Sequence, residues 1–196
     1  MGAAYKLGLV SVEDYLAGEL RSVVKHEYQN GFIYAMAGTT NNHGVIAGNV
    51  FGNLFQKLRG KRCRPYNSDT KVRIRSFNQT RFYYPDISVP RDSNPREDLY
   101  QDAPVIVVEV LSRSTRRTDT GEKKEAYVTI PSLSAYLLVE PDESVVTVFR
   151  RQDVEFVREV YEGHDAVIPL PEIEAELALS DIYEDVTFVA EPDEES

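Results

Sequence analysis

The chain has 196 residues, of which 42% are apolar and 28% charged, as expected of a soluble globular protein of one domain. It contains one cysteine, Cys63, and no run of 18 apolar residues, which excludes a disulfide framework and a membrane-spanning helix and favours the cytoplasm. The net charge of −10 argues against a nucleic-acid partner, but residues 57–81 carry nine basic residues against one acid.

The first half of the chain alternates helical and hairpin patterns. Ser11 is a suitable N-cap for a short helix, and Asn30-Gly31, flanked by alternating residues, predicts a hairpin over 25–38. Apolar residues at helical spacing predict a helix over 39–60, whose three internal glycines either weaken it or mark close packing. Two β-rich runs, 63–76 and 81–90, flank a polar turn.

The second half predicts a strand, a helix and a strand, followed by a hairpin. Residues 103–112 are apolar without alternation, as in a buried central strand, and the polar stretch 114–130 permits a helix that stops before Pro131. An apolar strand over 134–141 then makes 104–140 a right-handed parallel crossover. A hairpin over 144–163 and a short helix follow.

One mixed sheet flanked by helices is the natural packing for this order of elements. We therefore expect a single domain over residues 1–190. The acidic end of the chain, residues 191–196, is expected to be a disordered tail.

A carboxylate interrupts the most apolar of these strands. Glu109 stands in VIVVEVL, residues 105–111, where an ionised group is costly unless a salt bridge, an edge position or a metal ion compensates it. Asp86, in YYPDISV, is a second acid within a β-rich run. Two carboxylates from separate strands that meet at one sheet edge would suit Mg²⁺ or Mn²⁺, with a backbone carbonyl and waters. The alternatives are a structural salt bridge for Glu109 and a turn-like strand start for Asp86.

Basic residues follow Glu109 on the next predicted helix. Lys123 and Lys124 lie in its first turns, near the carboxyl end of the strand, so that a lysine can reach back to the acids. An ammonium there would orient a water or offset charge on phosphorus. The basic residues expected to hold a phosphate backbone are Arg116, Arg117, Lys71 and Arg73.

Several of these segments together resemble the Uma-type family of restriction-endonuclease-like proteins, a domain of unknown function within the PD-(D/E)XK nuclease superfamily. The resemblance covers roughly residues 11–186, and its most specific segment is EVLSRSTRRTDTGEK, residues 109–123. It implies an α/β fold with a restriction-endonuclease-like αβββαβ core. In that fold a mixed central sheet is flanked by helices, with added N-terminal and C-terminal hairpins.

The resemblance also implies roles for individual residues. Asp86 matches the Pro-Asp carboxylate and Glu109 the second acid of the motif, and the Val110 carbonyl would be a further metal ligand. The superfamily lysine is expected two residues after Glu109, but Leu111 stands there. Lys123 on the next helix takes its place in this family, near the same point in space.

Three further polar residues match the family pattern. Glu27 resembles the extra acid that some of these nucleases use beside the metal, with an exposed strand residue as the alternative. His43 and Asp69 match without an assigned role; the alternatives are a helix cap or packing residue and a turn residue, respectively. Tyr34 and Tyr127 are interpreted as core aromatics.

We predict a Mg²⁺- or Mn²⁺-dependent endonuclease that hydrolyses DNA phosphodiester bonds. Asp86 and Glu109 would hold the metal, and Lys123 would position the attacking water. One alternative is a catalytically inactive nuclease-fold module that binds nucleic acid or protein; another is a metal-dependent hydrolase of a different phosphoester, such as a nucleotide. The hairpin over 144–161, rich in Val and Phe, predicts pairing with a second copy in a homodimer or a higher homo-oligomer.

Overall fold

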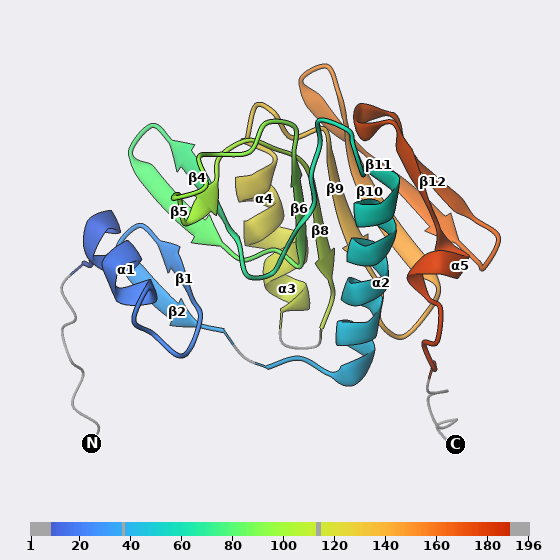
Figure 1. The fold of residues 1–196 in the computed structure, drawn as a ribbon, viewed down its shortest axis with the longest axis horizontal. Coiled ribbons are helices and arrows are strands. Elements are labelled where there is room, and N and C mark those ends of the chain that lie inside the picture. The colour runs from blue at the N-terminus through green and yellow to red at the C-terminus, as the bar shows by residue number, and fades with distance from the viewer. Residues whose placement is uncertain (1–8, 37, 113–114, 189–196) are drawn as a thin grey trace.

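The strands form two main sheets rather than the single sheet expected (Figure 1). The computed structural model describes residues 9–36, 38–112 and 115–188, so the expected tail, 191–196, lies outside the described residues. The strands are β1 His26–Gln29, β2 Phe32–Ala35, β3 Tyr66–Asn67, β4 Lys71–Ser76, β5 Gln79–Tyr83, β6 Ile87–Pro90, β7 Tyr100–Gln101, β8 Pro104–Val110, β9 Ala135–Val139, β10 Val145–Gln152, β11 Glu155–Glu162, β12 Val167–Leu170 and β13 Ala175–Ala178.

The order of strands separates the N-terminal hairpin from the central strands. One sheet has the order β2-β1-β5-β4-β7, and the other has the order β11-β10-β9-β8-β6-β3. A third, two-stranded sheet joins β12 and β13. The chain passes from the first main sheet to the second between β5 and β6, across Tyr84–Asp86. Pro85 lies at this crossing, and because it has no N–H it cannot continue a ladder of strand hydrogen bonds.

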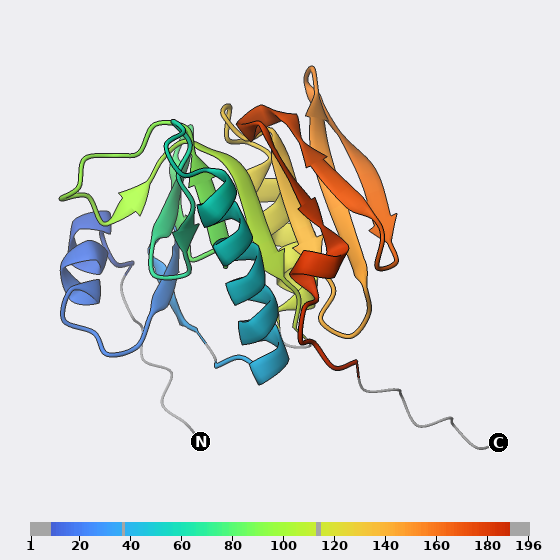
Figure 2. The same cartoon turned by 45° about the vertical axis from the view of Figure 1, so that its right-hand side comes forward.

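Helices cover both faces of the six-stranded sheet (Figure 2). The helices are α1 Val12–Glu19, α2 Asn41–Lys57, α3 Arg116–Thr118, the π-helix η1 Asp119–Lys123, α4 Lys124–Tyr127, the 3₁₀-helix η2 Pro171–Ile173 and α5 Leu179–Ile182. Strand β8 is buried at every position, which explains its apolar sequence without alternation. Its residues Ile106, Val108 and Val110 pack with α2, whereas Val107 packs with α4 on the opposite face.

The local predictions are largely confirmed. Ser11 caps α1 by accepting a hydrogen bond from the Asp14 N–H, and Asn30 and Gly31 both have positive φ in the β1–β2 turn, as a type I′ hairpin requires. Strands β8 and β9 are parallel, and the helical segment α3–η1–α4 connects them. Strands β10 and β11 form the expected hairpin.

Two expectations about helices need comment. The glycines of α2 do not mark close packing, because a Cβ on Gly44, Gly48 or Gly52 would meet nothing within 4 Å. The helix expected after β8 contains a five-residue π segment, which the polar sequence did not indicate. Within the described part of the chain, no helix has the length and apolar character needed to cross a bilayer.

Candidate active site

A cavity of about 240 Å³ lies where the two main sheets meet. The hairpin β1–β2, the start of α2, the crossing from β5 to β6, the end of β8 and the π segment all contribute to its wall. The residues of the predicted site that line it are Glu27, His43, Asp86, Glu109, Val110 and Lys123. The fold therefore brings these six residues, which the sequence analysis selected, together from five separate parts of the chain.

Asp86 and Glu109 are neighbours across the β6–β8 pair. The antiparallel register places Ile87 opposite Val108, so the position before β6 faces Glu109. The Asp86 N–H lies 3.4 Å from Glu109 Oε2, and Asp86 Oδ2 accepts a hydrogen bond of 2.7 Å from the Val110 N–H. Strand pairing thus holds two carboxylates, 23 positions apart in the sequence, side by side.

Lys123 is the buried cation of the cavity. Its Nζ lies 2.8 Å from Glu27 Oε1, 3.4 Å from Asp119 Oδ1 and 3.8 Å from Glu109 Oε1. The residue is only 5% exposed. Burial alone would lower the pKa of Lys123, but these three carboxylates raise it above its ordinary value. Lys123 therefore stays an ammonium at neutral pH.

Burial has the opposite effect on Glu109. It raises the pKa of the Glu109 carboxyl well above its usual range; Lys123 opposes this shift, and the neighbouring acids add to it. Tyr127 Oη donates a hydrogen bond of 3.4 Å to Glu109 Oε1. Tyr127 is thus a core aromatic, as interpreted from the sequence, that also contacts the site. A cation beside Glu109 would stabilise its ionised form.

Asp119 is a site residue that the sequence interpretation missed. It is 2% exposed and lines the same cavity, and its Oδ1 has no hydrogen-bond partner among the described residues apart from the ion-pair contact with Lys123. Asp119 and Lys123 are the first and last residues of the π-helix, a geometry that is rare and often found at functional sites. The four-residue spacing of Asp119 and Lys123 on a predicted helix was the available signal.

His43 lies at the first turn of α2, where its N–H donates to the Thr40 side chain. Its Nε2 is 3.3 Å from Asp86 Oδ2. Burial opposes protonation, but Asp86 and a hydrogen bond to the Val110 backbone raise the pKa of His43 above its usual value. The residue therefore packs at the helix start, as the alternative interpretation held, and also contacts the proposed metal ligand Asp86.

Of two other residues interpreted from the sequence, Asp69 lies outside this cavity and Tyr34 lines it. Asp69 stands in an exposed turn and forms an ion pair of 2.6 Å with Lys25. Tyr34, interpreted as a core aromatic, is instead 49% exposed and lines the cavity wall, so that interpretation is wrong. It is exposed because β2 is the edge strand of its sheet.

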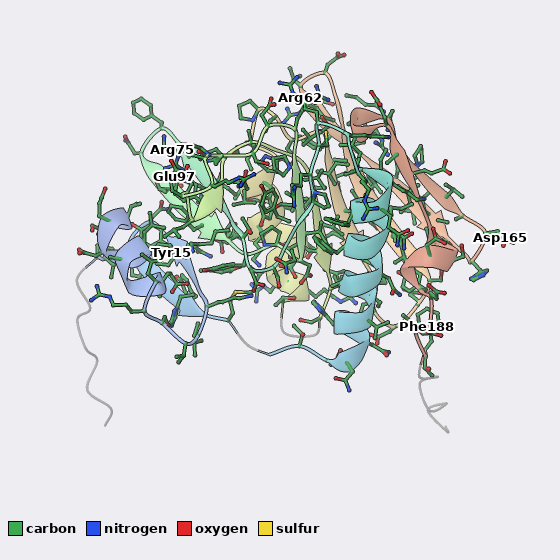
Figure 3. The ribbon with its side chains drawn as sticks, in the orientation of Figure 1. Tyr15, Arg62, Arg75, Glu97, Asp165 and Phe188 are labelled. Carbon is green, nitrogen blue, oxygen red and sulfur yellow. The ribbon has the colours of Figure 1, made fainter. Side chains whose placement is uncertain are left out.

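The predicted phosphate-binding residues are mostly engaged within the protein. Lys71 is buried and donates to Tyr84 Oη, Arg73 forms a two-bond pair with Asp102, and Arg116 does so with Glu140. Arg117 is exposed. Figure 3 shows Arg62 and Arg75, from the basic stretch 57–81, well apart on the surface. This stretch therefore does not form one continuous basic patch.

The donor set of the cavity suits a hard divalent cation. Among residues 9–36, 38–112 and 115–188, no group of three or more His, Cys, Asp or Glu side chains is arranged to hold a metal ion. Mg²⁺, however, commonly takes only one or two protein carboxylates, together with waters and other oxygens. The buried Asp119 Oδ1 has no hydrogen-bond partner among the described residues, and the Lys123 ammonium lies 3.4 Å from it. Asp86, Glu109 and the Val110 carbonyl are oxygen donors of the type that Mg²⁺ takes.

Comparison with known proteins places this site in a family. Residues 12–181 match the Uma2 family model, described as "Putative restriction endonuclease". The chain belongs to the Uma2 family. Family membership supports a nuclease-like function, and it confirms the resemblance inferred from the sequence.

Similar proteins include two from Synechocystis sp. (strain PCC 6803). The uncharacterized protein slr1290 is 38% identical over 145 residues, which cover 74% of this chain and 75% of that protein. The uncharacterized protein sll1609 is 29% identical over 135 residues, which cover 67% of this chain and 75% of that protein.

A solved structure is similar in fold. It is the crystal structure of a "putative nuclease belonging to DUF820" from Anabaena variabilis, and it is 21% identical to this chain with a TM-score of 0.69. The match covers 89% of this chain and 97% of that protein. The expected α/β class, with mixed sheets flanked by helices, is thereby confirmed.

Proposed function

We propose that this Uma2-family protein is a metal-dependent endonuclease that hydrolyses phosphodiester bonds in DNA. The observation that carries the proposal is the adjacency of Asp86 and Glu109, with the Lys123 ammonium in the same buried cavity. Two carboxylates and an ammonium are the groups that the PD-(D/E)XK motif combines, although here the lysine comes from the following helix.

The cation would be held by Asp86, Glu109 and the Val110 carbonyl, with Glu27 nearby. Bound Mg²⁺ or Mn²⁺ would polarise the phosphodiester and offset the charge that develops on its oxygens. The protein fixes the orientation of these ligands in advance. The Val110 N–H and His43 hold Asp86, and Tyr127 holds Glu109, as outer hydrogen bonds commonly do around metal ligands.

Lys123 positions the attacking water. Its Nζ is placed by Glu27 and Asp119 on one side and by Glu109 on the other, which restricts the directions in which it can donate a hydrogen bond. Because Lys123 is charged, it also stabilises negative charge on the phosphoryl oxygens. Asp119 acts through Lys123 and is therefore a positioning residue.

DNA would reach the cavity along its exposed rim. Arg117 is exposed next to the π segment, and Arg116 can exchange its contact with Glu140 for a phosphate. Lys71 and Arg73 would have to leave internal contacts to do the same. The single buried, unpaired cysteine, Cys63, supports a cytoplasmic location.

Cleavage of supercoiled plasmid with Mn²⁺ tests the proposal. We expect the wild type to cut, and Asp86→Ala, Glu109→Ala and Lys123→Ala to lose at least a hundredfold in rate, which corresponds to about 2.7 kcal/mol or more of transition-state stabilisation. Asp92→Ala is the matched control, because this acid pairs with Arg62 on the surface, far from the chemistry. Equal cutting by wild type and all three site variants would overturn the assignment.

Two other outcomes would favour the alternatives. If calorimetry detects Mn²⁺ binding that Asp86→Ala abolishes, but no substrate is cleaved, the protein is a nuclease-fold binding module. If the protein hydrolyses bis(p-nitrophenyl) phosphate but leaves single-stranded and duplex DNA intact, it is a hydrolase of a smaller phosphoester. The cavity volume of about 240 Å³ favours this last alternative, because it suits a small phosphoester.

A further inference from the structure

The strand β2 has features that are unusual for the free edge of a sheet. It ends the five-stranded sheet, and each of its residues is exposed, including Phe32 at 56%, Ile33 at 42% and Tyr34 at 49% (Figure 1). Residues 31–38, GFIYAMAG, contain no charge and no proline. Natural proteins normally protect such edges with charges, prolines or covering segments, since an apolar edge pairs readily with another strand.

The backbone of β2 presents a defined set of groups to the outer edge of its sheet, where the described residues provide no further strand. The two-residue turn makes Gln29 and Phe32 a hydrogen-bonded pair, and the register places Glu27 opposite Tyr34 in the next such pair. The Met36 N–H continues this alternation by donating to the Lys25 carbonyl at 2.9 Å. The N–H and C=O groups of the intervening residues, Ile33 and Ala35, therefore point away from β1, toward the free edge.

We propose that β2 pairs antiparallel with β2 of a second copy, across a two-fold axis at Tyr34. In this register Ile33 of one copy exchanges both backbone hydrogen bonds with Ala35 of the other, and the reverse pair does the same. The five-stranded sheets of the two copies then form one continuous sheet. Because the strand carries no charge, its pairing with itself brings no like charges together.

The exposed apolar area is sufficient to contribute much of such an interface. Val23 and Val24 are also exposed and lie beside Met36, at the end of β2. Taking roughly 200 Å² for a large side chain, the exposed parts of these valines and of Phe32, Ile33 and Tyr34 amount to about 580 Å². A standard interface buries about 800 Å² per partner, so the patch supplies more than half of it.

The opposite edge of the molecule is a weaker candidate, although the sequence suggested it. Strand β11, the outer strand of the hairpin 144–161, carries charged residues along its length: Glu155, Arg158, Glu159 and Glu162. Charged side chains are the usual protection of a free edge. Antiparallel pairing of β11 with itself would also require several glutamates to approach one another.

Pairing through β2 has a consequence for the candidate active site. Tyr34, Ala35 and Met36 line the cavity, and Tyr34 stands opposite Glu27 across the β1–β2 pair. The second copy would therefore complete the rim of each cavity at this strand. The dimer proposal does not depend on the proposed catalysis, since it concerns only the edge of the sheet.

Engineered disulfide formation tests the register directly. With Tyr34 on the axis, the two copies form a non-hydrogen-bonded pair there, with Cα atoms about 4.5 Å apart, within the range of a disulfide. In a Cys63→Ser background, we expect Tyr34→Cys to give a disulfide-linked dimer under mild oxidation. The matched control Phe77→Cys, which is fully exposed in the β4–β5 turn, should remain monomeric on a non-reducing gel.

Mass measurement by light scattering at tens of micromolar tests the interface without a covalent bond. The wild type should have the mass of two chains. Ile33→Glu and Ile33→Pro, which leave the β1 ladder intact, should shift it to that of one chain with unchanged far-UV circular dichroism. Phe77→Glu and Val160→Glu, the latter on β11, should remain dimers. A monomeric wild type, or loss of the dimer only in Val160→Glu, would overturn the proposal.

Discussion

Replacement of Lys123 by methionine should strongly destabilise the fold. Methionine keeps most of the volume of the side chain but removes its charge. Three buried carboxylates, those of Glu27, Glu109 and Asp119, then lose the cation that lies 2.8–3.8 Å from them. Removing one partner of a buried ion pair costs about 3–5 kcal/mol, because the remaining charge is left uncompensated in a medium of low polarity.

The expected change is large enough to measure without ambiguity. For a domain of this size, 1 kcal/mol lowers Tm by about 2–4 °C, so Lys123→Met should lower Tm by about 6–20 °C. Addition of Mn²⁺ should restore part of this loss, because a divalent cation bound by Asp86 and Glu109 neutralises the same cluster. The part of the Tm loss that Mn²⁺ reverses is electrostatic. Any part that remains comes from altered packing, which a metal ion does not repair.

Thermal unfolding followed by circular dichroism, with and without Mn²⁺, provides the measurement. Lys124→Met is the matched control: it removes an adjacent lysine whose ammonium lies 4.8 Å from the Phe149 ring centroid, a contact worth about 1 kcal/mol or less. A Lys123→Met protein as stable as the wild type would refute the reasoning. It would mean that the carboxylates take up protons in place of the ammonium at little cost.

Three further predictions concern other parts of the chain. Mn²⁺ at tenfold its Kd should raise the unfolding free energy of the wild type by about 1.4 kcal/mol, and chelation with EDTA or the variant Asp86→Ala should abolish this gain, as differential scanning fluorimetry will show. Gly31→Ala should cost about 1 kcal/mol or more, because φ is +97° and the new Cβ would lie 2.8 Å from Leu9; thermal unfolding against Gly163→Ala, which has positive φ but open space, isolates the steric part. Burial raises the pKa of Asp102, but hydrogen bonds from Arg73 and Asn94 outweigh burial and hold that pKa below its ordinary value. The ionised Asp102 therefore stabilises the fold by about 1 kcal/mol after solvent screening. This stabilisation is complete above pH ~4, the pKa of an unfolded Asp, and is lost as pH falls through the folded pKa. Asp102→Asn should therefore differ in urea midpoint from the wild type at pH 6 but converge with it once the pH falls below the folded pKa of Asp102.

The elements that depend on local sequence were predictable. A two-residue type I′ turn requires positive φ at both positions, which Asn30 and Gly31 tolerate. Residues 103–112 are mostly apolar because helices cover both faces of the sheet. The adjacency of Asp86 and Glu109 was also predictable, since an acid in a buried strand needs a compensating cation, which a second carboxylate beside it can share. Each of these inferences uses a short segment and one physical requirement.

Features that depend on distant contacts were not predictable in the same way. The basic residues of 57–81 suggested a surface that binds phosphate. Arg73, however, pairs with Asp102, 29 positions away, and no periodicity in the sequence predicts such a pair. The division into two sheets was likewise not predictable, because the chain changes sheet repeatedly, for instance between β3 and β4, between β5 and β6 and between β7 and β8, and in the sequence each of these changes looks like one more turn between strands. Asp119 was missed because its burial follows from the π turn rather than from an apolar pattern.

Under the proposed function, the position of Lys123 compensates for the absence of a lysine at position 111. Leu111, where the motif lysine is expected, packs in a buried apolar cluster with Tyr127 and Leu133, and a charge there would be costly. The π segment instead brings Lys123 to the cavity, within 3.8 Å of Glu109. A buried ammonium on a helix needs fixed counter-charges to hold it, and Glu27 and Asp119 provide them. Glu27 and Asp119 therefore supply the counter-charges that a buried ammonium at position 123 requires.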